Sequence, residues 1–255
     1  MDKRVEEDTL TSESASFTNY VNTPAVYEVN NNLSVPKYLD ETYWWAYLHP
    51  KGVAFFDKPL IVNGILFGNY RRLRDSVIRT ILNSPGNVLQ LAAVYGNISP
   101  RIAKAIAPEH QLDVVDVAEI QLKNLSRKVT SMQNVYLHHQ DASSLELSIQ
   151  DYEYVLLFFI LHEVPDELKR GILREAFAHC KPGGKITIVD YHKPVAFSPM
   201  RYLMWPVLAT LEPFALPMWH NDVRKWLPDE YEVASYEKKT YFGGLYQKIE
   251  ITLAE

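Results

Sequence analysis

The segment Val88-Leu89-Gln90-Leu91-Ala92-Ala93-Val94-Tyr95-Gly96 begins with an apolar run and ends in small residues and a glycine. A continuous apolar run that leads into a turn is typical of a strand covered on both faces, as in a parallel sheet. From this segment to the C-terminus, apolar runs alternate with amphipathic stretches. Strands that alternate with helices in this way predict an α/β fold with a mostly parallel sheet.

The other expected elements follow the same alternation. We expect strands at 112–116, 135–139, 152–159 and 185–190, and helices at 100–107, 118–128 and 167–180. Two last apolar segments, 231–241 and 245–253, are joined through Gly243-Gly244 and predict an antiparallel hairpin. The predicted fold class is therefore α/β and Rossmann-like, with a mostly parallel seven-stranded sheet that ends in an antiparallel C-terminal hairpin.

Three regions differ in composition. Residues 1–18 are acidic and lack an apolar core, so we expect a disordered tail and neither a secretory signal nor a transit peptide. Residues 19–84 are rich in aromatic side chains and predict a helical cap on an α/β domain at 85–255. An apolar insertion at 195–222 is too broken by prolines to span a membrane and predicts a short helix pair over a pocket.

Length and charge exclude several classes of protein. With 255 residues and 47% hydrophobic residues, the chain can bury one substantial core. The net charge of −5 argues against nucleic acid as the main partner, because phosphate binding needs a concentrated excess of Lys and Arg. The single cysteine, Cys180, excludes an intramolecular disulfide and is expected to be buried and inert.

Acidic residues follow two of the expected strands. In an open parallel sheet, ligands bind beyond the carboxyl ends of the strands. Asp116-Val117 lies about 20 residues past the first loop, where a carboxylate can bind ribose hydroxyls, although Asp116 could instead cap the next helix. Asp141-Ala142 could bind an adenine ring, and the alternative for Asp141 is a solvated turn.

The last two parallel strands end in titratable residues. His162 and Glu163 follow the fourth strand, and Asp190 and His192 follow the fifth. Together they could bind a divalent cation such as Mg²⁺ or Mn²⁺, or they could act as general acid and base without a metal. A structural role for His162 in its loop is the alternative.

The first loop aligns with the acidic-x-Gly-x-Gly-x-Gly loop of S-adenosylmethionine enzymes, although only Gly96 of its glycines remains. Ala92 replaces one glycine, and Gln90 replaces the acidic residue. The segments 63–74 (NGILFGNYRRLR), 161–163 (LHE) and 181–185 (KPGGK) resemble the ubiquinone and menaquinone C-methyltransferase family. The resemblance implies the class I methyltransferase fold, with S-adenosylmethionine near residues of three strand ends: Gln90, Ala92, Gly96, Asp116, Val117, Asp141 and Ala142.

Four more particular strings resemble the RquA family of rhodoquinone-biosynthesis proteins, which are methyltransferase homologues. They are 88–96 (VLQLAAVYG), 189–194 (VDYHKP), 211–215 (LEPFA) and 242–248 (FGGLYQK). This resemblance implies conversion of ubiquinone to rhodoquinone, in which an amino group from S-adenosylmethionine replaces a ring methoxy group with Mn²⁺ as cofactor. We expect a cytoplasmic, peripheral place on the inner membrane, with the apolar insertion lying at the bilayer surface, and the alternative for the insertion is an ordinary lid buried against the core.

The expected catalytic residues are Tyr95, His162, Glu163, Asp190 and His192, of which the last four would also be the metal ligands. A donor such as Tyr95 or His162 would stabilise the oxyanion that develops on the quinone. Because a neutral amide does not favour the ammonium form, Gln90 would leave the donor amine nucleophilic. Two alternatives stay open: a methyltransferase acting on a quinone, quinol or similar lipophilic phenol, and a non-catalytic protein that binds S-adenosylmethionine or lipid.

Overall fold

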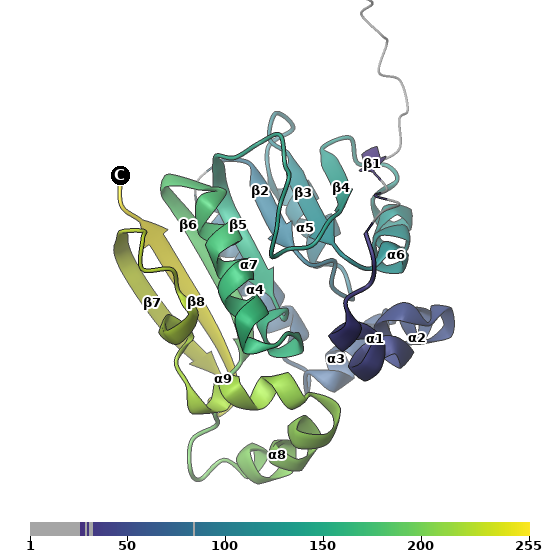
Figure 1. The fold of residues 1–255 in the computed structure, drawn as a ribbon, viewed down its shortest axis with the longest axis vertical. Coiled ribbons are helices and arrows are strands. Elements are labelled where there is room, and N and C mark those ends of the chain that lie inside the picture. Colours follow the sequence, from purple (N-terminus) through teal and green to yellow (C-terminus); the bar gives the residue numbers. More distant parts are fainter. Residues whose placement is uncertain (1–25, 29, 31–32, 84) are drawn as a thin grey trace, which may run out of the picture.

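The computed structural model describes residues 26–28, 30, 33–83 and 85–255, so the predicted tail at 1–18 lies outside the described residues. The described chain forms one sheet in the order β1-β4-β3-β2-β5-β6-β8-β7 (Figure 1). The strands are β1 (Val26–Glu28), β2 (Val88–Leu91), β3 (Leu112–Asp116), β4 (Val135–His139), β5 (Tyr152–Phe158), β6 (Cys180–Tyr191), β7 (Val233–Tyr241) and β8 (Tyr246–Leu253).

The fold class predicted from the sequence is confirmed. Strands β1 to β6 pair in parallel, and β8 pairs antiparallel with both β6 and β7. The seven expected strands are all present, and the short β1 adds an eighth at the edge beside β4. The chain runs from β2 outward through β3 and β4, and then returns to the other side of β2 with β5. This reversal creates the switch point at which open α/β sheets bind ligands.

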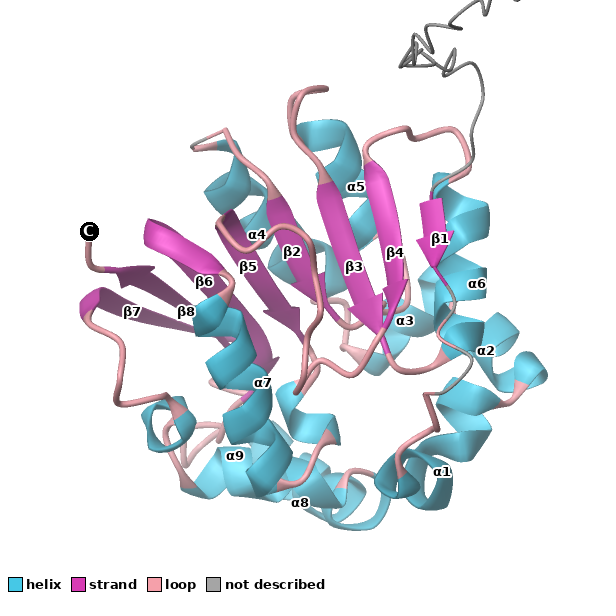
Figure 2. Ribbon diagram, turned by 45° about the horizontal axis from the view of Figure 1, so that its top comes forward, coloured by secondary structure: helices cyan, strands magenta, loops and turns pink. Residues whose placement is uncertain are grey.

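Helices cover both faces of the sheet (Figures 1 and 2). On one face, the apolar side chains of α4 (Tyr70–Leu82), α5 (Ile98–Ala105) and α6 (Glu119–Val129) join those of the sheet in one cluster. On the other face, α7 (Asp166–Ala178) forms a second cluster. Neighbouring residues of a strand point to opposite faces, and both faces are buried, which explains the continuous apolar runs of the sequence.

Two helical segments lie beyond the carboxyl ends of the strands (Figure 2). The N-terminal one, which we call the cap, contains α1 (Lys37–Tyr43), a π-helix (Trp44–Leu48), α2 (Pro50–Phe56) and α3 (Pro59–Ile65). The other, which we call the insertion, contains α8 (Pro199–Leu211), a 3₁₀ turn (Pro213–Ala215) and α9 (Leu216–His220). Helix α4, within the region expected to be cap, packs on the sheet instead.

Proline marks the start of four helices, and one further proline, Pro206, lies inside α8. Helices α2, α3, α8 and α9 carry a proline in the first turn, where the missing N–H has no intrahelical partner to lose. Among the residues that the structure describes, no helix combines the length and apolar character needed to cross a bilayer.

The loop after β2 retains a glycine-like backbone without the glycines. Ala92 has a φ of 76°, in the left-handed region that L-residues rarely adopt, and Gly96 has a φ of 89°. A Cβ added to Gly96 would approach the Tyr70 hydroxyl oxygen to 2.4 Å. Glycine is therefore required at position 96, because the backbone is left-handed there and a Cβ would collide with Tyr70. Ala92 adopts its left-handed backbone at an energetic cost.

We predict that Ala92→Gly stabilises the protein by about 0.5–1 kcal/mol, because relief of the left-handed strain exceeds the added entropy of the unfolded chain. The free energy of unfolding from a urea titration measures this change. Ala93→Gly is the matched control, since Ala93 lies in the same loop at a negative φ, and it should lower stability. A loss of stability in Ala92→Gly would contradict the strain that we assign to this residue.

Candidate functional site

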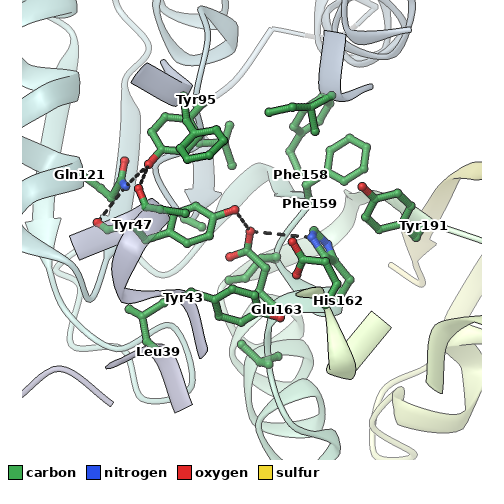
Figure 3. A pocket seen from close by; sticks show the side chains of 18 of the residues that line it. Leu39, Tyr43, Tyr47, Tyr95, Gln121, Phe158, Phe159, His162, Glu163 and Tyr191 are labelled. Carbon is green, nitrogen blue, oxygen red and sulfur yellow. Dashed lines mark hydrogen bonds and ion pairs between the residues drawn. The ribbon is translucent and has the colours of Figure 1, made fainter. Parts of the chain in front are cut away.

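A pocket of about 610 Å³ lies beyond the carboxyl ends of β2 to β5, between the sheet, the cap and the insertion. Its volume is within the range of small-molecule sites. Most of its lining is apolar, and the polar groups gather at the ends of β3 and β5 and on the facing helical segments. Figure 3 shows how the side chains of the cap, the loop after β2 and the loop after β5 meet in this pocket.

The loop after β2 lines the pocket with residues 92–95, whereas Gln90 does not reach it. Gln90 is fully buried: its Nε2 donates to the Ala92 carbonyl oxygen at 2.8 Å, and its Oε1 accepts from Ser99 Oγ at 2.9 Å. The Gln90 amide thus fixes the backbone of the loop through bonds on the side away from the pocket. Position 90 therefore places neither a carboxylate nor an amide at the pocket surface.

Gly96, at the end of the loop, also lies outside the pocket lining. Its N–H donates to Asp57 Oδ1 at 2.9 Å, and its carbonyl oxygen accepts from Lys128 Nζ at 2.9 Å. Lys128 and Asp57 form an ion pair at 2.8 Å. Of the cofactor-binding residues expected in this loop, the structure brings Ala92 to the pocket and uses Gln90 and Gly96 as supports.

Asp116 closes the loop onto the end of β3. Its Oδ2 accepts from the backbone N–H of Ala93 at 2.7 Å, and its Oδ1 accepts from that of Ala118 at 2.7 Å. Burial raises the pKa of Asp116 to about 7, although both N–H bonds oppose this rise. Asp116 does not cap α6, because Ala118 is the N-cap residue of that helix and has no side-chain cap bond; the bond from the Ala118 N–H to Asp116 closes a turn before the helix. Asp116 and Val117 both line the pocket.

Asp141 and Ala142 line the same side of the pocket. Asp141 Oδ1 accepts from the backbone N–H of Ser143 at 2.8 Å and from its hydroxyl at 2.7 Å, which closes an Asx turn. The turn fixes the backbone of Ala142 beside the pocket. Asp141 therefore both closes a turn, which was the alternative to a binding role, and lines the pocket.

Asp190, at the end of β6, organises the loop after β5. Its carboxylate is fully buried and accepts from the backbone N–H groups of Leu161 at 2.9 Å and Tyr191 at 2.7 Å. It also contacts His162 Nδ1 at 2.9 Å, which directs His162 Nε2 toward Glu163 Oε1 at 3.8 Å. The structure thus brings His162, Glu163 and Asp190 together, as the sequence predicted.

The cap reaches this group through Tyr47, which also stacks on Tyr95 of the loop after β2 (Figure 3). Tyr47, in the π-helix, donates its hydroxyl to Glu163 Oε1 and stacks on Tyr95 with 5.5 Å between ring centroids. Tyr95 donates to the Ala46 carbonyl oxygen and accepts from Gln121 Nε2 at 3.0 Å. A π-helix often marks a functional site, and here it places Tyr47 between the two strand-end loops.

Burial and crowding shift the protonation of these groups. Burial alone would lower the pKa of His162, but the carboxylates of Asp190, Glu212 and Glu163 raise it to about 9. Burial raises the pKa of Glu163 to about 8, against the lowering effect of His162. Burial also raises the pKa of Glu212. Near neutral pH, the ligand-free site therefore holds an imidazolium paired with Asp190 and a neutral Glu163 carboxyl group beside it.

Three residues of the site were missed from the sequence. Tyr47 and Glu212 both line the pocket, from the cap and from the end of α8. Lys169 is fully buried and donates to the carbonyl oxygens of Val164 at 2.6 Å and Phe214 at 3.2 Å. It thereby joins the loop after β5 to the insertion. The string 211–215, which carried part of the resemblance, was the one signal that pointed to Glu212.

His192 does not join the other predicted metal ligands. Its Nδ1 contacts the Gly244 carbonyl oxygen at 2.9 Å, and His192 is absent from the pocket lining. In the part of the chain that the structure describes, no group of three or more His, Cys, Asp or Glu side chains is arranged to hold a metal ion. The buried Cys180, whose pKa burial raises to about 12, agrees with the predicted inert thiol.

Comparisons with known proteins agree with the fold. Residues 88–184 match the methyltransferase domain family. The chain is similar to demethylmenaquinone methyltransferases of Listeria monocytogenes (34% identical over 110 residues, 42% of this chain and 46% of the relative) and Staphylococcus aureus (29% over 133 residues, 52% and 54%). The chain thus spans about half the length of the curated relatives it matches.

Solved structures extend the likeness in fold to most of the chain. The N-methyltransferase NodS from Bradyrhizobium japonicum, in complex with S-adenosyl-L-homocysteine, aligns with a TM-score of 0.57 at 11% identity over 82% of this chain and 95% of its own. The magnesium protoporphyrin IX methyltransferase of Synechocystis, with the same ligand bound, aligns with a TM-score of 0.61 at 12% identity over 86% and 100%. The class I methyltransferase fold is therefore established.

We predict that Asp190→Asn lowers the pKa of His162 well below 9, because the neutral amide no longer stabilises the imidazolium while burial still opposes it. NMR titration of the His162 ring protons between pH 5 and 10 measures the pKa. Asp222→Asn removes a carboxylate elsewhere on the chain and should leave that pKa unchanged. A pKa of His162 near 9 in Asp190→Asn would show that Asp190 is not the source of the charge.

Proposed function

We propose that this chain transfers the amino group of S-adenosylmethionine to the ring of ubiquinone, in place of a methoxy group. The observation that carries the proposal is the protonated end of the pocket. His162 is an imidazolium and Glu163 is neutral near pH 7, so both can donate a proton or a hydrogen bond. Donors of this kind suit an electrophilic carbonyl group, which a quinone has.

S-adenosylmethionine would lie along the ends of β2, β3 and β4. The support is the fold shared with two structures that hold S-adenosyl-L-homocysteine, together with the pocket lining. In the proposed pose, Asp116 and Val117 bind the ribose, Asp141 and Ala142 bind the adenine, and the loop at 92–95 contacts the methionine part.

The quinone would occupy the apolar part of the pocket between the sheet, the cap and α8. This part is lined by Phe159 from the loop after β5, Ile65 from α3, and Leu203 and Val207 from α8. The similarity to enzymes named demethylmenaquinone methyltransferases also favours a quinone-type ligand. An apolar pocket with few polar groups at one end matches a lipophilic ring with polar substituents.

In the proposed reaction, the amine nitrogen adds to the ring carbon that bears the methoxy group. Negative charge develops on the conjugated carbonyl oxygen, and the His162 imidazolium stabilises it by a hydrogen bond. The methoxy oxygen leaves as methanol with a proton from the Glu163 carboxyl, which recovers a proton from the attacking nitrogen. This exchange leaves the ring nitrogen bonded to Cα of the donor, so amino transfer is completed only when that Cα–N bond is cleaved in a separate step, to which we assign no residue. Asp190 keeps His162 charged and oriented throughout.

The donor amine must be neutral to attack. In the loop after β2, the residue expected to be acidic is Gln90, whose amide bonds to Ser99 and Ala92 and lies outside the pocket lining. Position 90 therefore lacks the carboxylate whose negative charge would stabilise the ammonium form of the amine. This feature supports amino transfer, although Gln90 acts by its neutrality and not by direct contact.

Methyl transfer to a quinol or similar lipophilic phenol is the second candidate, and the names of the curated relatives favour it. A phenolic acceptor must lose a proton, so the site would need a base. His162 and Glu163 are protonated below about pH 8, which makes them poor bases there. A non-catalytic binding protein is less well supported, because it has no need for a charged histidine buried beside three carboxyl groups.

The Mn²⁺ that the resemblance implies does not fit the residues present. Of the four expected ligands, His192 faces Gly244, and His162 Nδ1 is occupied by Asp190.

A membrane surface is the proposed source of the quinone. Helix α8 and the segment before it expose large apolar side chains at the mouth of the pocket, and α3 does the same across the pocket. Leu203 (54% exposed), Leu211 (50%) and Ile65 (45%) are both exposed and part of the pocket lining. Apolar patches of this kind mark interaction sites, and the net charge of −5 leaves apolar contact as the attraction to lipid. A cytoplasmic place on the inner membrane remains a prediction.

The transferred group can be identified with doubly labelled S-adenosylmethionine, which carries ¹⁵N at the α-amine and ¹³C at the methyl group. We expect the purified chain to convert ubiquinone to a product that contains ¹⁵N and lacks one methoxy group, as measured by mass spectrometry. Glu163→Gln should lower the rate about 100-fold or more, because the amide cannot supply the leaving-group proton. A product with ¹³C alone would establish methyl transfer instead.

A further inference from the structure

Tyr191, the last residue of β6, lines the pocket beside His162. Its ring contacts the His162 imidazole edge to face, with 4.8 Å between the ring centroids and 87° between the ring planes. The preceding residue, Asp190, contacts the same imidazole at Nδ1. Two consecutive residues at the end of one strand therefore hold His162 in place.

The Tyr191 side chain is fixed by its surroundings. Its ring packs against Phe159 and Tyr246, with 5.6 Å and 5.7 Å between the ring centroids. Its backbone N–H donates to Asp190 Oδ1 at 2.7 Å, and its carbonyl oxygen accepts from Gln247 Nε2 at 2.9 Å. A side chain held in this way loses little conformational freedom when a ligand binds, so its hydroxyl is preorganised for a hydrogen bond.

The Tyr191 hydroxyl is open to the pocket. The hydroxyls of Tyr47 and Tyr95 form hydrogen bonds within the protein, whereas no described residue forms one with the hydroxyl of Tyr191 (Figure 3). The Tyr191 hydroxyl is not enclosed by protein atoms either, so it borders the space of the pocket. Figure 3 shows it directed toward the interior of the pocket, where a ligand can reach it.

The protonation of Tyr191 differs from that of its neighbours. A phenolic hydroxyl donates a hydrogen bond only while it is protonated. Burial raises the pKa of Tyr191 well above its usual range. The nearby groups that add to this rise are Tyr246, Glu212, Asp190 and Glu163. Tyr191 therefore remains a donor over the pH range in which Glu163 and then His162 lose their protons.

We infer that Tyr191 donates a second hydrogen bond to the ring carbonyl oxygen that His162 contacts. The identity of this ring rests on the proposed function. A carbonyl oxygen has two lone pairs and can accept from both donors, and two donors on an oxygen that gains negative charge form an oxyanion site. The ligand class is then a ring that carries a carbonyl oxygen, because a hydrocarbon ring can accept neither bond.

The test compares decyl-tailed ubiquinone with decylbenzene, which shares the tail and has no ring oxygen. Isothermal titration in one detergent at pH 7 gives the Kd of each ligand for the full chain without S-adenosylmethionine. Tyr191→Phe removes only the hydroxyl, so it should weaken quinone binding roughly 5–10-fold and change decylbenzene binding less than twofold. An unchanged quinone Kd, or an equal loss for the two ligands, would overturn the inference.

Tyr246→Phe is the matched control. Tyr246 packs against the Tyr191 ring, and it is buried outside the pocket lining. Because the Tyr191 hydroxyl remains in this variant, both Kd values should stay within twofold of those of the wild type. A loss of quinone binding as large as that in Tyr191→Phe would show that ring packing causes the effect, and the inference would fail.

The pH profile separates direct donation from an effect on the charge of His162. At pH 10, His162 is mostly neutral and Tyr191 is still protonated. Quinone binding in Tyr191→Phe should therefore still be roughly 5–10-fold weaker than in the wild type at pH 10. If the two proteins bind the quinone equally at pH 10 and differ only at pH 7, the hydroxyl acts through the His162 charge, contrary to the inference.

Binding is measured without turnover, so the result does not depend on which group is transferred from the donor. Failure of the wild-type chain to bind the quinone would overturn the proposed ligand, and the inference with it. Equal quinone Kd values for the wild type and Tyr191→Phe at pH 7 would overturn the inference alone.

Discussion

The site depends on one buried carboxylate, Asp190. A carboxylate without solvent is stable only when its oxygens are bonded, and Asp190 accepts from backbone N–H groups and from His162 Nδ1. These bonds fix the loop after β5 against the end of β6, and the negative charge keeps His162 protonated. The shape of the loop and the charge of its histidine therefore have a common cause.

Two further contacts bring the helical segments to this loop. Tyr47 donates from the cap to Glu163, and Lys169 joins the backbone after Glu163 to that of the insertion at Phe214. The pocket is thus assembled from three parts of the chain that are distant in sequence. Its apolar walls come from the cap and α8, and its polar end comes from the sheet, so a lipophilic ring with polar substituents fits both.

The sheet and the strand ends could be predicted from the sequence, because strands covered on both faces leave continuous apolar runs and ligand-binding residues follow them. The direction of individual side chains could not: Gln90 and His192 turn to local partners that only the folded backbone provides. Glu212 and Lys169 lay in segments without strand or loop signals, and a fully buried lysine is too rare to expect. The three-residue β1 is too short for a recognisable strand pattern.

The central claim is that the pocket receives the quinone with protonated groups. The most direct test is the affinity of the chain for decyl-tailed ubiquinone between pH 6 and 10, without S-adenosylmethionine. We expect a constant Kd up to about pH 8 and progressively weaker binding above it, as Glu163 and then His162 lose their protons. A Kd that is independent of pH, or that improves above pH 8, would contradict it.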